Sequence, residues 1–395
     1  MLELRGVTQQ YDWGTVDAIP HLLGETADGE PHAEYWLGAH PLSAATTAQG
    51  SLADVIAANP EILGRRPLNT FGPVLPFLFK VLSAQHPLSL QAHPDRQQAE
   101  EGFTRENGAD LPLDDPERVY RDAWPKPEVL VALDRFEALT SFREPTATAE
   151  LFDGLGVSAE LASVIGPLTE RKGAAAIAEV FLDALSLEGE RKQLLDVLAA
   201  AAVKHSRDDG PVGQLAKDVL LLDEVFPGDP AILAALLLNR VTLEPGQAFF
   251  VPPGQMHVYL RGTGIEVMAN SDNVIRGGLT PKHVDVRELV RVVDFEPKPI
   301  QIIEPAAGEP GVLSYPVPCE EFALWRLDLT PELGWINLPG RGSARIAFTT
   351  VGQASVASGS HALTIGQGDA ILAGADEDTR IEGHGSVFVT AAGLR

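Results

Sequence analysis

The chain has 395 residues, of which 45% are hydrophobic and 22% charged, a composition that is typical of globular proteins and excludes wholesale disorder. Its 55 acidic residues outnumber its 30 basic ones, and the net charge of −25 argues against nucleic acids and anionic membranes as partners. The single cysteine, Cys319, excludes an intramolecular disulfide and a thiolate metal site.

The start of the chain and its apolar runs bear on location. Residues 1–6 lack the basic and then apolar plan of a secretory signal. The richest apolar run, 231–238, is far shorter than the roughly 18–20 residues that span a bilayer. We therefore expect a cytoplasmic protein. The length of the chain suggests two or three domains.

The first region, 1–145, is rich in proline, glycine and aromatic residues, which is typical of short strands between turns. Short helices are expected after the cap candidate Ser51 and from Asp95 to about Arg105. The expected strands of this region are 74–81, 129–132 and 136–142.

The second region, 146–238, changes to alanine- and leucine-rich sequence with apolar residues at three- and four-residue spacing, which predicts a helical domain. Asp229-Pro230 suits a helix start, with the aspartate as cap. The expected helices are 159–166, 172–185, 188–204, 212–224 and 230–237.

After residue 241 the β pattern returns and continues to the C-terminus. The turn and apolar run at 246–251 recur weakly at 368–373, an alignment that pairs His257 with Thr379. Because a helical block lies between β blocks without strand–helix alternation, antiparallel jelly rolls fit better than a doubly wound sheet. We predict a mainly β protein with a helical insertion (α+β), made of two related β-barrel units and one all-helical domain.

Four residues on three segments could hold a metal ion. In the expected strand 88–94, Ser89, Gln91 and His93 share one face, although a solvated strand face would show the same pattern. Glu128 begins an apolar strand, where a lone buried carboxylate is costly, and His257 follows a Pro-Gly turn. Both could also be ordinary structural residues. Together Gln91, His93, Glu128 and His257 suit Zn²⁺ or another divalent ion.

The polar loop 266–285 carries two separated cations. Arg276 precedes two glycines and could hold an oxyanion through its planar guanidinium, with Lys282 adding a point charge. A turn that merely uses its glycines is the alternative. No phosphate-binding loop or dinucleotide fingerprint is present in the sequence.

Several strings, in order between about 10 and 290, resemble the type I phosphomannose isomerase family of the cupin superfamily. They include Tyr11 to Gly14, Ala33 to Pro41, Pro76 to Leu82, Leu88 to Asp95, Lys126 to Glu128, Val251 to Tyr259 and Ala269 to Val286. The resemblance implies a cupin fold and the interconversion of mannose 6-phosphate and fructose 6-phosphate through a cis-enediol(ate). It also implies a role in carbohydrate metabolism that supplies a precursor of GDP-mannose.

The resemblance also implies roles for individual residues. One Zn²⁺ per chain is expected on Gln91, His93, Glu128 and His257, with Arg276 as the active-site arginine. The remaining pocket residues are expected to be Lys80, Lys126, Glu266, Asp272, Tyr259, Trp13 and Glu34. Ser89 and Lys282 are candidates for holding the substrate phosphate. The proton-transferring base stays open among Glu266, Asp272 and a lysine.

The implied domains are a catalytic cupin domain (1–145 with 239–295), a helical domain (146–238) and a C-terminal jelly roll without a metal site (296–395). The sequence departs from the family at Pro125, where a histidine is common, and His40 and His283 are not obvious substitutes. An iron-dependent cupin oxygenase and a non-catalytic sugar-binding cupin are the alternatives. A small phosphorylated sugar is the expected partner, and we expect a monomer.

Overall fold

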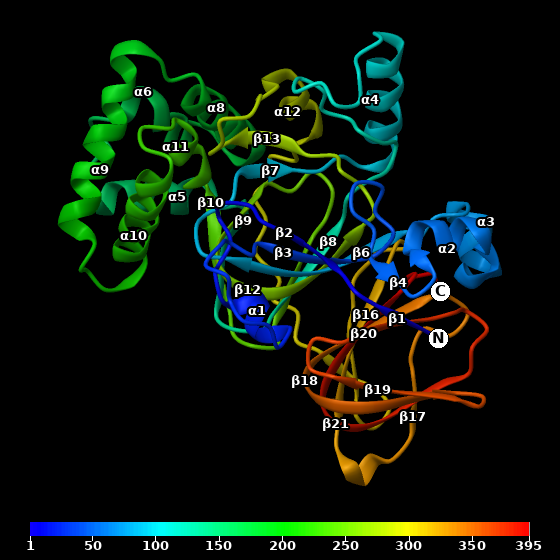
Figure 1. Ribbon diagram of the computed structural model, residues 1–395. Helices are drawn as coiled ribbons and strands as arrows, with labels where there is room; N and C mark the ends of the chain where they lie inside the picture. Colours follow the sequence, from blue (N-terminus) through cyan, green and yellow to red (C-terminus); the bar gives the residue numbers. More distant parts are fainter. Residues whose placement is uncertain (395) are drawn as a thin grey trace.

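The computed structural model describes residues 1–394 and is mainly antiparallel sheet with helices. A central sheet lies between a helical block on one side and a second sheet on the other, as Figure 1 shows. Among residues 1–394, no helix combines the length and apolar character that crossing a membrane requires.

The central sheet has ten strands, and the path through it is open rather than closed into a barrel. The path runs β10-β9-β12-β6-β3-β2, and β7, β8, β11 and β13 branch from it. Its strands are β2 (Val7–Gln9), β3 (Glu34–Leu37), β6 (Phe77–Ala84), β7 (Leu90–Ala92), β8 (Glu128–Ala132), β9 (Phe136–Phe142), β10 (Leu238–Leu243), β11 (Ala248–Val251), β12 (His257–Ala269) and β13 (Ile275–Gly278).

The long strand β12 holds the two halves of this sheet together. Its first residues, from His257, pair with β9 and β7, whereas its last residues, 264–269, pair with β6 and β8. Strand β6 is buried along all eight residues, as expected for a strand covered on both faces. Side chains from both halves can therefore meet over β12.

The second sheet has nine strands in the order β1-β20-β18-β21-β16-β15-β14, with β17 on β21 and β19 on β18. Its strands are β1 (Leu2–Leu4), β14 (Ala306–Ala307), β15 (Val312–Tyr315), β16 (Ala323–Leu329), β17 (Ile336–Asn337), β18 (Arg345–Ser358), β19 (His361–Gly366), β20 (Ala370–Ala373) and β21 (Thr379–Ala391). A small sheet pairs β4 (Thr46–Thr47) with β5 (Gly50–Ser51). Phe348 packs against Tyr35 and Phe79 with ring centroids 6.3 and 5.7 Å apart, so one apolar core joins the two large sheets.

The weak internal repeat corresponds to two matching pairs of strands. β11 and β20 have four residues each and start 122 residues apart, and β12 and β21 have thirteen residues each at the same offset. His257 and Thr379 each begin the longer strand of their pair. The aligned positions are therefore structurally equivalent along the chain.

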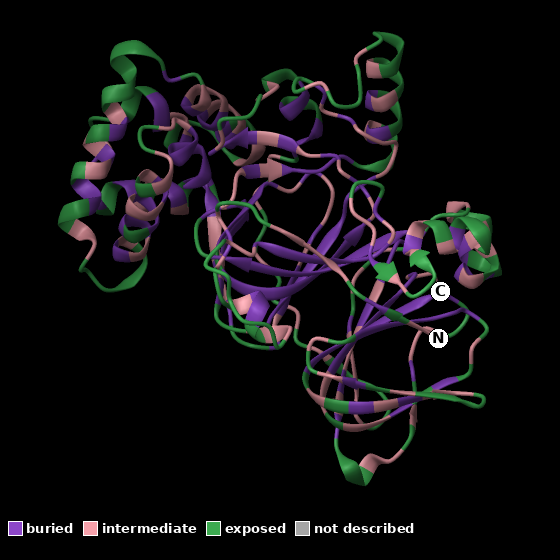
Figure 2. Ribbon diagram, viewed as in Figure 1, coloured by how far each residue is buried: buried purple, intermediate pink, exposed green. Residues whose placement is uncertain are grey.

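The helical block lies between β9 and β10, which are themselves paired. Its helices are α5 (Pro145–Gly154), α6 (Ala162–Ile165), α7 (Pro167–Glu170), α8 (Gly173–Leu185), α9 (Gln193–His205), α10 (Gly210–Val225) and α11 (Ala231–Ala235), with the 3₁₀ turn η2 (Gly189–Lys192). Figure 2 shows their buried faces turned inward and their exposed faces outward. Phe181 makes T-shaped contacts with Phe142 and Phe295, with ring centroids 5.7 and 5.6 Å apart, and these contacts fix the block to the sheet.

Five helices lie outside the block: α1 (Ala18–Leu22), α2 (Leu52–Ala58), α3 (Arg65–Phe71), α4 (Arg96–Gly108) and α12 (Val286–Val292), together with 3₁₀ turns η1 (Pro60–Leu63) and η3 (Pro331–Leu333). The cap prediction at Ser51 is confirmed, because its hydroxyl accepts from Asp54 N–H. Asp95, expected as the first residue of its helix, is instead the cap of α4 and forms a capping box with Gln98, and Pro230 rather than Asp229 is the cap residue of α11. The sequence missed α1, α3, α5, α7 and α12, and the strand expected at 88–94 is shortened to β7.

Removing the Phe181 ring should destabilise the junction between the helical block and the sheet. Phe181→Ala leaves a cavity among fully buried side chains, and we expect the free energy of unfolding to fall by about 3–5 kcal/mol, measured by urea unfolding. Val203 is 63% exposed on α9, so Val203→Ala should change stability by less than about 0.5 kcal/mol. Equal effects of both variants would contradict this packing.

Candidate active site

A cavity of about 780 Å³ opens on the central sheet, walled by strands from both of its halves. Twelve of the fourteen residues singled out from the sequence line it, and His93 and His257 are fully buried. The twelve are Trp13, Glu34, Lys80, Ser89, Gln91, Lys126, Glu128, Tyr259, Glu266, Asp272, Arg276 and Lys282. The structure therefore brings together residues that lie up to 269 positions apart in the chain.

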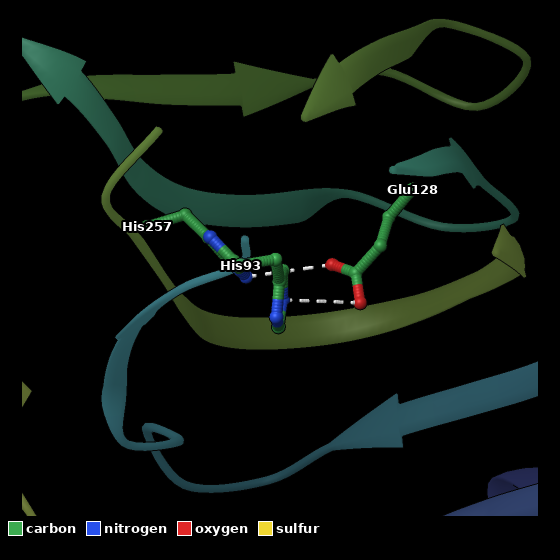
Figure 3. Close-up of side chains that lie close together, drawn as sticks. All are labelled: His93, Glu128 and His257. Atoms are coloured by element: carbon green, nitrogen blue, oxygen red, sulfur yellow. Dashed lines mark ion pairs between the residues drawn. The ribbon is translucent and has the colours of Figure 1, made fainter. Parts of the chain in front are cut away.

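The Glu128 carboxylate faces both buried imidazoles, which lie beside each other (Figure 3). Its Oε1 is 3.3 Å from His93 Nε2 and its Oε2 is 3.4 Å from His257 Nε2. The three ligand atoms lie within 4.8 Å of one another. His93 directly follows β7, Glu128 begins β8 and His257 begins β12, so strand ends fix all three positions.

The state of the two imidazoles fits a bound cation. His93 Nδ1 lies 2.9 Å from the Asn273 carbonyl and His257 Nδ1 lies 3.3 Å from the Gln255 carbonyl. Because a carbonyl only accepts hydrogen bonds, each Nδ1 carries the proton and each Nε2 presents a lone pair. Both Nε2 atoms are buried without a hydrogen-bond partner. Two bare lone pairs facing a carboxylate repel it, and a divalent ion with tetrahedral preference, such as zinc, satisfies all three groups.

Strand register places Gln91 beside this cluster. Gln91 is directly opposite His257 in the β7–β12 pair and directly opposite Arg276 in the β13–β7 pair. Directly opposed residues of antiparallel strands project from the same face of the sheet. The side chains of Gln91, His257 and Arg276 therefore share one face, which supports Gln91 as the fourth ligand.

Burial and neighbouring charges oppose each other at these ligands. Burial lowers the pKa of His257 to about 4, which keeps the imidazole neutral. Burial alone would raise the pKa of Glu128, but the positive charge of His93, when its Nε2 is protonated in the absence of a metal, and that of Lys126 hold it well below its usual range. Lys126 Nζ lies 3.5 Å from Glu128 Oε1. Glu128 is therefore an anion that the surrounding cations stabilise.

A second group of charges surrounds Lys80 on the cavity wall. Its Nζ lies 3.2 Å from both Glu34 Oε1 and Glu266 Oε2, and it sits 5.3 Å above the Trp36 ring. Burial alone would lower the pKa of Lys80, but the two carboxylates outweigh burial and raise it. Lys80 is therefore a cation at neutral pH.

Glu266 is the carboxyl group of this network that titrates near neutrality. Burial raises its pKa to about 7, and Lys80 opposes part of that rise. Its Oε1 accepts a hydrogen bond from the Tyr259 hydroxyl at 2.9 Å. Burial raises the pKa of Tyr259, so the phenol stays protonated and donates. Glu266 can thus both give and take a proton near pH 7.

Asp272 forms a separate pair with a histidine. His40 Nε2 lies 3.2 Å from Asp272 Oδ1, and His40 Nδ1 accepts the Leu42 N–H at 3.3 Å. Burial would raise the pKa of Asp272, but the bond from His40 lowers it. His40 thus stabilises the Asp272 carboxylate in the cavity wall.

Arg276 and Lys282, the other two cations of the cavity that were expected from the sequence, have no carboxylate within 4.0 Å in residues 1–394. Burial, and then the charge of Arg121, lowers the pKa of Arg276. Burial and the charges of Arg276 and Arg121 also lower the pKa of Lys282. Like charges without a counterion mark a site for an anion.

Sequence reasoning missed several parts of the cavity. Arg121, His86 and, from the helical block, Val225 and Phe226 line it. The two residues from the helical block add an apolar wall to the cavity. Only strand and helix packing brings them to the cavity, so no local motif could have indicated them.

The departure from the family at Pro125 has a defined setting. Trp124, the preceding residue, packs on Phe71 with centroids 5.7 Å apart and beneath the Arg96 guanidinium at 5.0 Å. His40 is bonded to Asp272, and His283 is not among the residues that line the cavity. His86 is the histidine that does line it.

Comparison with known proteins agrees with this geometry. Residues 1–145 match the family described as phosphomannose isomerase type I, catalytic domain. The mannose-6-phosphate isomerase of Escherichia coli (strain K12) is 37% identical over 394 residues, 98% of each chain. The chain belongs to the type I phosphomannose isomerase family. The mannose-6-phosphate isomerase of Rattus norvegicus is 31% identical and covers 94% of this chain and 92% of its own.

Solved structures of the family have the same overall fold. The apo form of mannose 6-phosphate isomerase from Salmonella typhimurium superposes with a TM-score of 0.91 at 36% identity, covering 100% of this chain and 99% of its own. A mannose 6-phosphate isomerase bound with zinc and yttrium gives the same TM-score and identity and covers 100% of each chain. In this chain the His93–Glu128–His257 cluster is a group of side chains that could hold a metal ion.

Removing one imidazole should abolish metal binding, whereas removing Arg276 should not. We expect His257→Ala to lose bound zinc and Arg276→Ala to keep about one equivalent per chain, measured by atomic absorption after dialysis. Arg276→Ala should lower kcat by at least about hundredfold, because it removes positive charge beside the reacting atoms. Normal turnover of Arg276→Ala, or a second tightly bound zinc, would contradict these assignments.

Proposed function

We propose that this protein is a zinc-dependent aldose–ketose isomerase that interconverts mannose 6-phosphate and fructose 6-phosphate. The observation that carries the proposal is a buried cluster of two bare imidazole nitrogens and one carboxylate, of which the carboxylate lines the same cavity as unpaired cations. A metal ion held by the cluster can bind the sugar oxygens, and the cations can bind the phosphate. Family membership supports the same substrate pair.

The cavity has two kinds of wall that match the two ends of such a substrate. Around Lys80 and Lys126, every cation is paired with a carboxylate within 3.5 Å. Arg276 and Lys282 have no such partner in the described chain. A neutral sugar ring fits the balanced wall, and a phosphate dianion fits the unpaired cations together with the Ser89 hydroxyl.

The reaction moves one proton between adjacent carbons and one between the oxygens that these carbons carry, through a cis-enediol. Gln91, His93, Glu128 and His257 would hold the zinc ion, which would supply positive charge that polarises the substrate oxygens. Arg276 shares a sheet face with Gln91 and His257, so its guanidinium stabilises negative charge that develops beside the metal ligands. Glu266, with its pKa of about 7, removes the proton from one carbon and returns it to the next. Tyr259 and Lys80 hold the Glu266 carboxylate in place.

The unpaired cations also separate this proposal from its alternatives. An iron-dependent cupin oxygenase needs two histidines and a carboxylate but has no use for cations without counterions. A non-catalytic sugar-binding cupin has no use for a carboxyl group held near neutrality by burial. The phosphosugar isomerase uses both features.

We propose that the two large sheets are cupin-type jelly rolls, with a catalytic domain of 1–145 and 239–295, a helical domain of 146–238 and a C-terminal domain of 296–395. The matching strand pairs β11–β12 and β20–β21 support two related β units. Thr379 stands in the second unit where His257 stands in the first, which supports a C-terminal domain without a metal ligand set. A monomer located in the cytoplasm stays a prediction of the sequence.

Turnover should depend on both the substrate phosphosugar and the metal. A coupled assay of fructose 6-phosphate formation from mannose 6-phosphate should show turnover by the zinc-loaded protein and its loss after chelation. Adding zinc back should restore the rate. No turnover by zinc-loaded protein would overturn the isomerase proposal, and turnover without metal would overturn the role of zinc.

The pH dependence of turnover should report the ionisation of Glu266. As a base it must be deprotonated, so kcat/KM should rise with pH through about 7. Lys80→Met removes a charge that favours the carboxylate, so the pKa of Glu266 should rise and the acid limb should move to higher pH. Lys298 is 56% exposed and paired with Asp294, so Lys298→Met serves as the matched control. An acid limb that does not move in Lys80→Met would exclude Glu266 as the titrating base.

A further inference from the structure

Arg121 lines the same cavity as Arg276 and Lys282 but belongs to a different segment of the chain. It is half-buried, and its Nη1 donates to the Leu113 carbonyl at 2.7 Å. It has no carboxylate within 4.0 Å in the described residues 1–394. The hydrogen bond to Leu113 orients the planar guanidinium, and its remaining N–H groups are free to bind a ligand.

The backbone that carries Arg121 is anchored by Asn273. Arg121 N–H donates to Asn273 Oδ1 at 2.8 Å, and Asn273 Nδ2 donates to the Asp122 and Trp124 carbonyls at 2.9 Å each. The Asn273 side chain is fully buried. Its own carbonyl lies 2.9 Å from Nδ1 of His93. One buried residue thus fixes both the Arg121 backbone and the orientation of a metal ligand.

The positive charge of Arg121 contributes to the lowered pKa values of two neighbouring cations. After burial, Arg121 is a cause of the lowered pKa of Arg276 and one of two such causes for Lys282. Of the carboxylates in the same wall, Glu34, Glu128 and Glu266 are paired with lysines, and Asp272 with His40. Asp12 lies at an exposed position of the wall. Three cations that repel one another in a chain of net charge −25 are stabilised when a dianion binds between them.

We propose that Arg121 binds the substrate phosphate together with Arg276 and Lys282, and so determines the preference for a phosphorylated over a neutral sugar. This inference rests on the proposed function for the identity of the substrate. A planar guanidinium binds two phosphate oxygens at once, which a lysine does not. Because Asn273 also orients His93, the phosphate is held at a fixed position relative to the metal ligands.

The test removes the Arg121 side chain and leaves its anchor intact. In Arg121→Ala the backbone N–H to Asn273 Oδ1 remains, so zinc content and thermal stability should match the wild-type protein. KM for mannose 6-phosphate should rise about ten- to hundredfold, with kcat changed less than about threefold. Arg121→Lys keeps the charge without the planar geometry and should recover part of the loss in affinity.

The matched control is Arg207→Ala, which removes the same charge at an exposed position before α10. The sixteen residues of α10 span about 24 Å, and Phe226 at their far end lines the cavity, so Arg207 is remote from it. This variant should keep the wild-type KM.

Binding of inorganic phosphate to the zinc-loaded protein, measured by calorimetry, tests the site without turnover. Arg121→Ala should weaken phosphate binding about as much as it raises KM, and Arg207→Ala should not. Unchanged phosphate binding in Arg121→Ala would overturn the inference even if the wild-type protein isomerises mannose 6-phosphate. If Arg121→Ala binds phosphate more weakly but the wild-type protein does not isomerise mannose 6-phosphate, the proposed function would be overturned and the phosphate site would stand.

Discussion

The active site depends on how a buried negative charge is balanced. Glu128 begins a strand whose five residues are all buried, and a carboxylate there is stable only beside positive charge. Lys126 supplies part of that charge, and the bare Nε2 atoms of His93 and His257 leave a position that a divalent cation fills. The metal is therefore part of the balance of charges that allows this strand to be buried, as well as part of the chemistry.

The same principle organises the rest of the cavity. Lys80 is buried because Glu34 and Glu266 flank it, and Glu266 keeps a pKa near 7 because burial and Lys80 act in opposite directions. Where the pairing of charges stops, at Arg121, Arg276 and Lys282, the protein is ready for an anion. In the proposed mechanism, the cations without a partner bind the phosphate and the paired charges around Glu266 serve proton transfer.

Much of this site could be predicted from sequence because its residues lie in short strings on strands. The alternation of Ser89, Gln91 and His93 and the position of Glu128 before an apolar run both led to the correct wall of the cavity. The pairing of His40 with Asp272 and of Arg121 with Asn273 could not be predicted, because each joins segments more than 150 residues apart. Helices α5 and α12 were missed although proline and aspartate mark their starts, because their apolar spacing is short and irregular.

The helical block also affects how the central sheet forms. Strands β9 and β10 are neighbours, with Leu238 opposite Phe142, yet the whole block separates them in the chain. Closing such a long loop before anything inside it has folded costs conformational entropy, and pairings of high sequence separation form slowly. Folding of the block brings the two strand ends together and shortens the effective loop, so early collapse around Phe181 favours a faster route to the complete sheet.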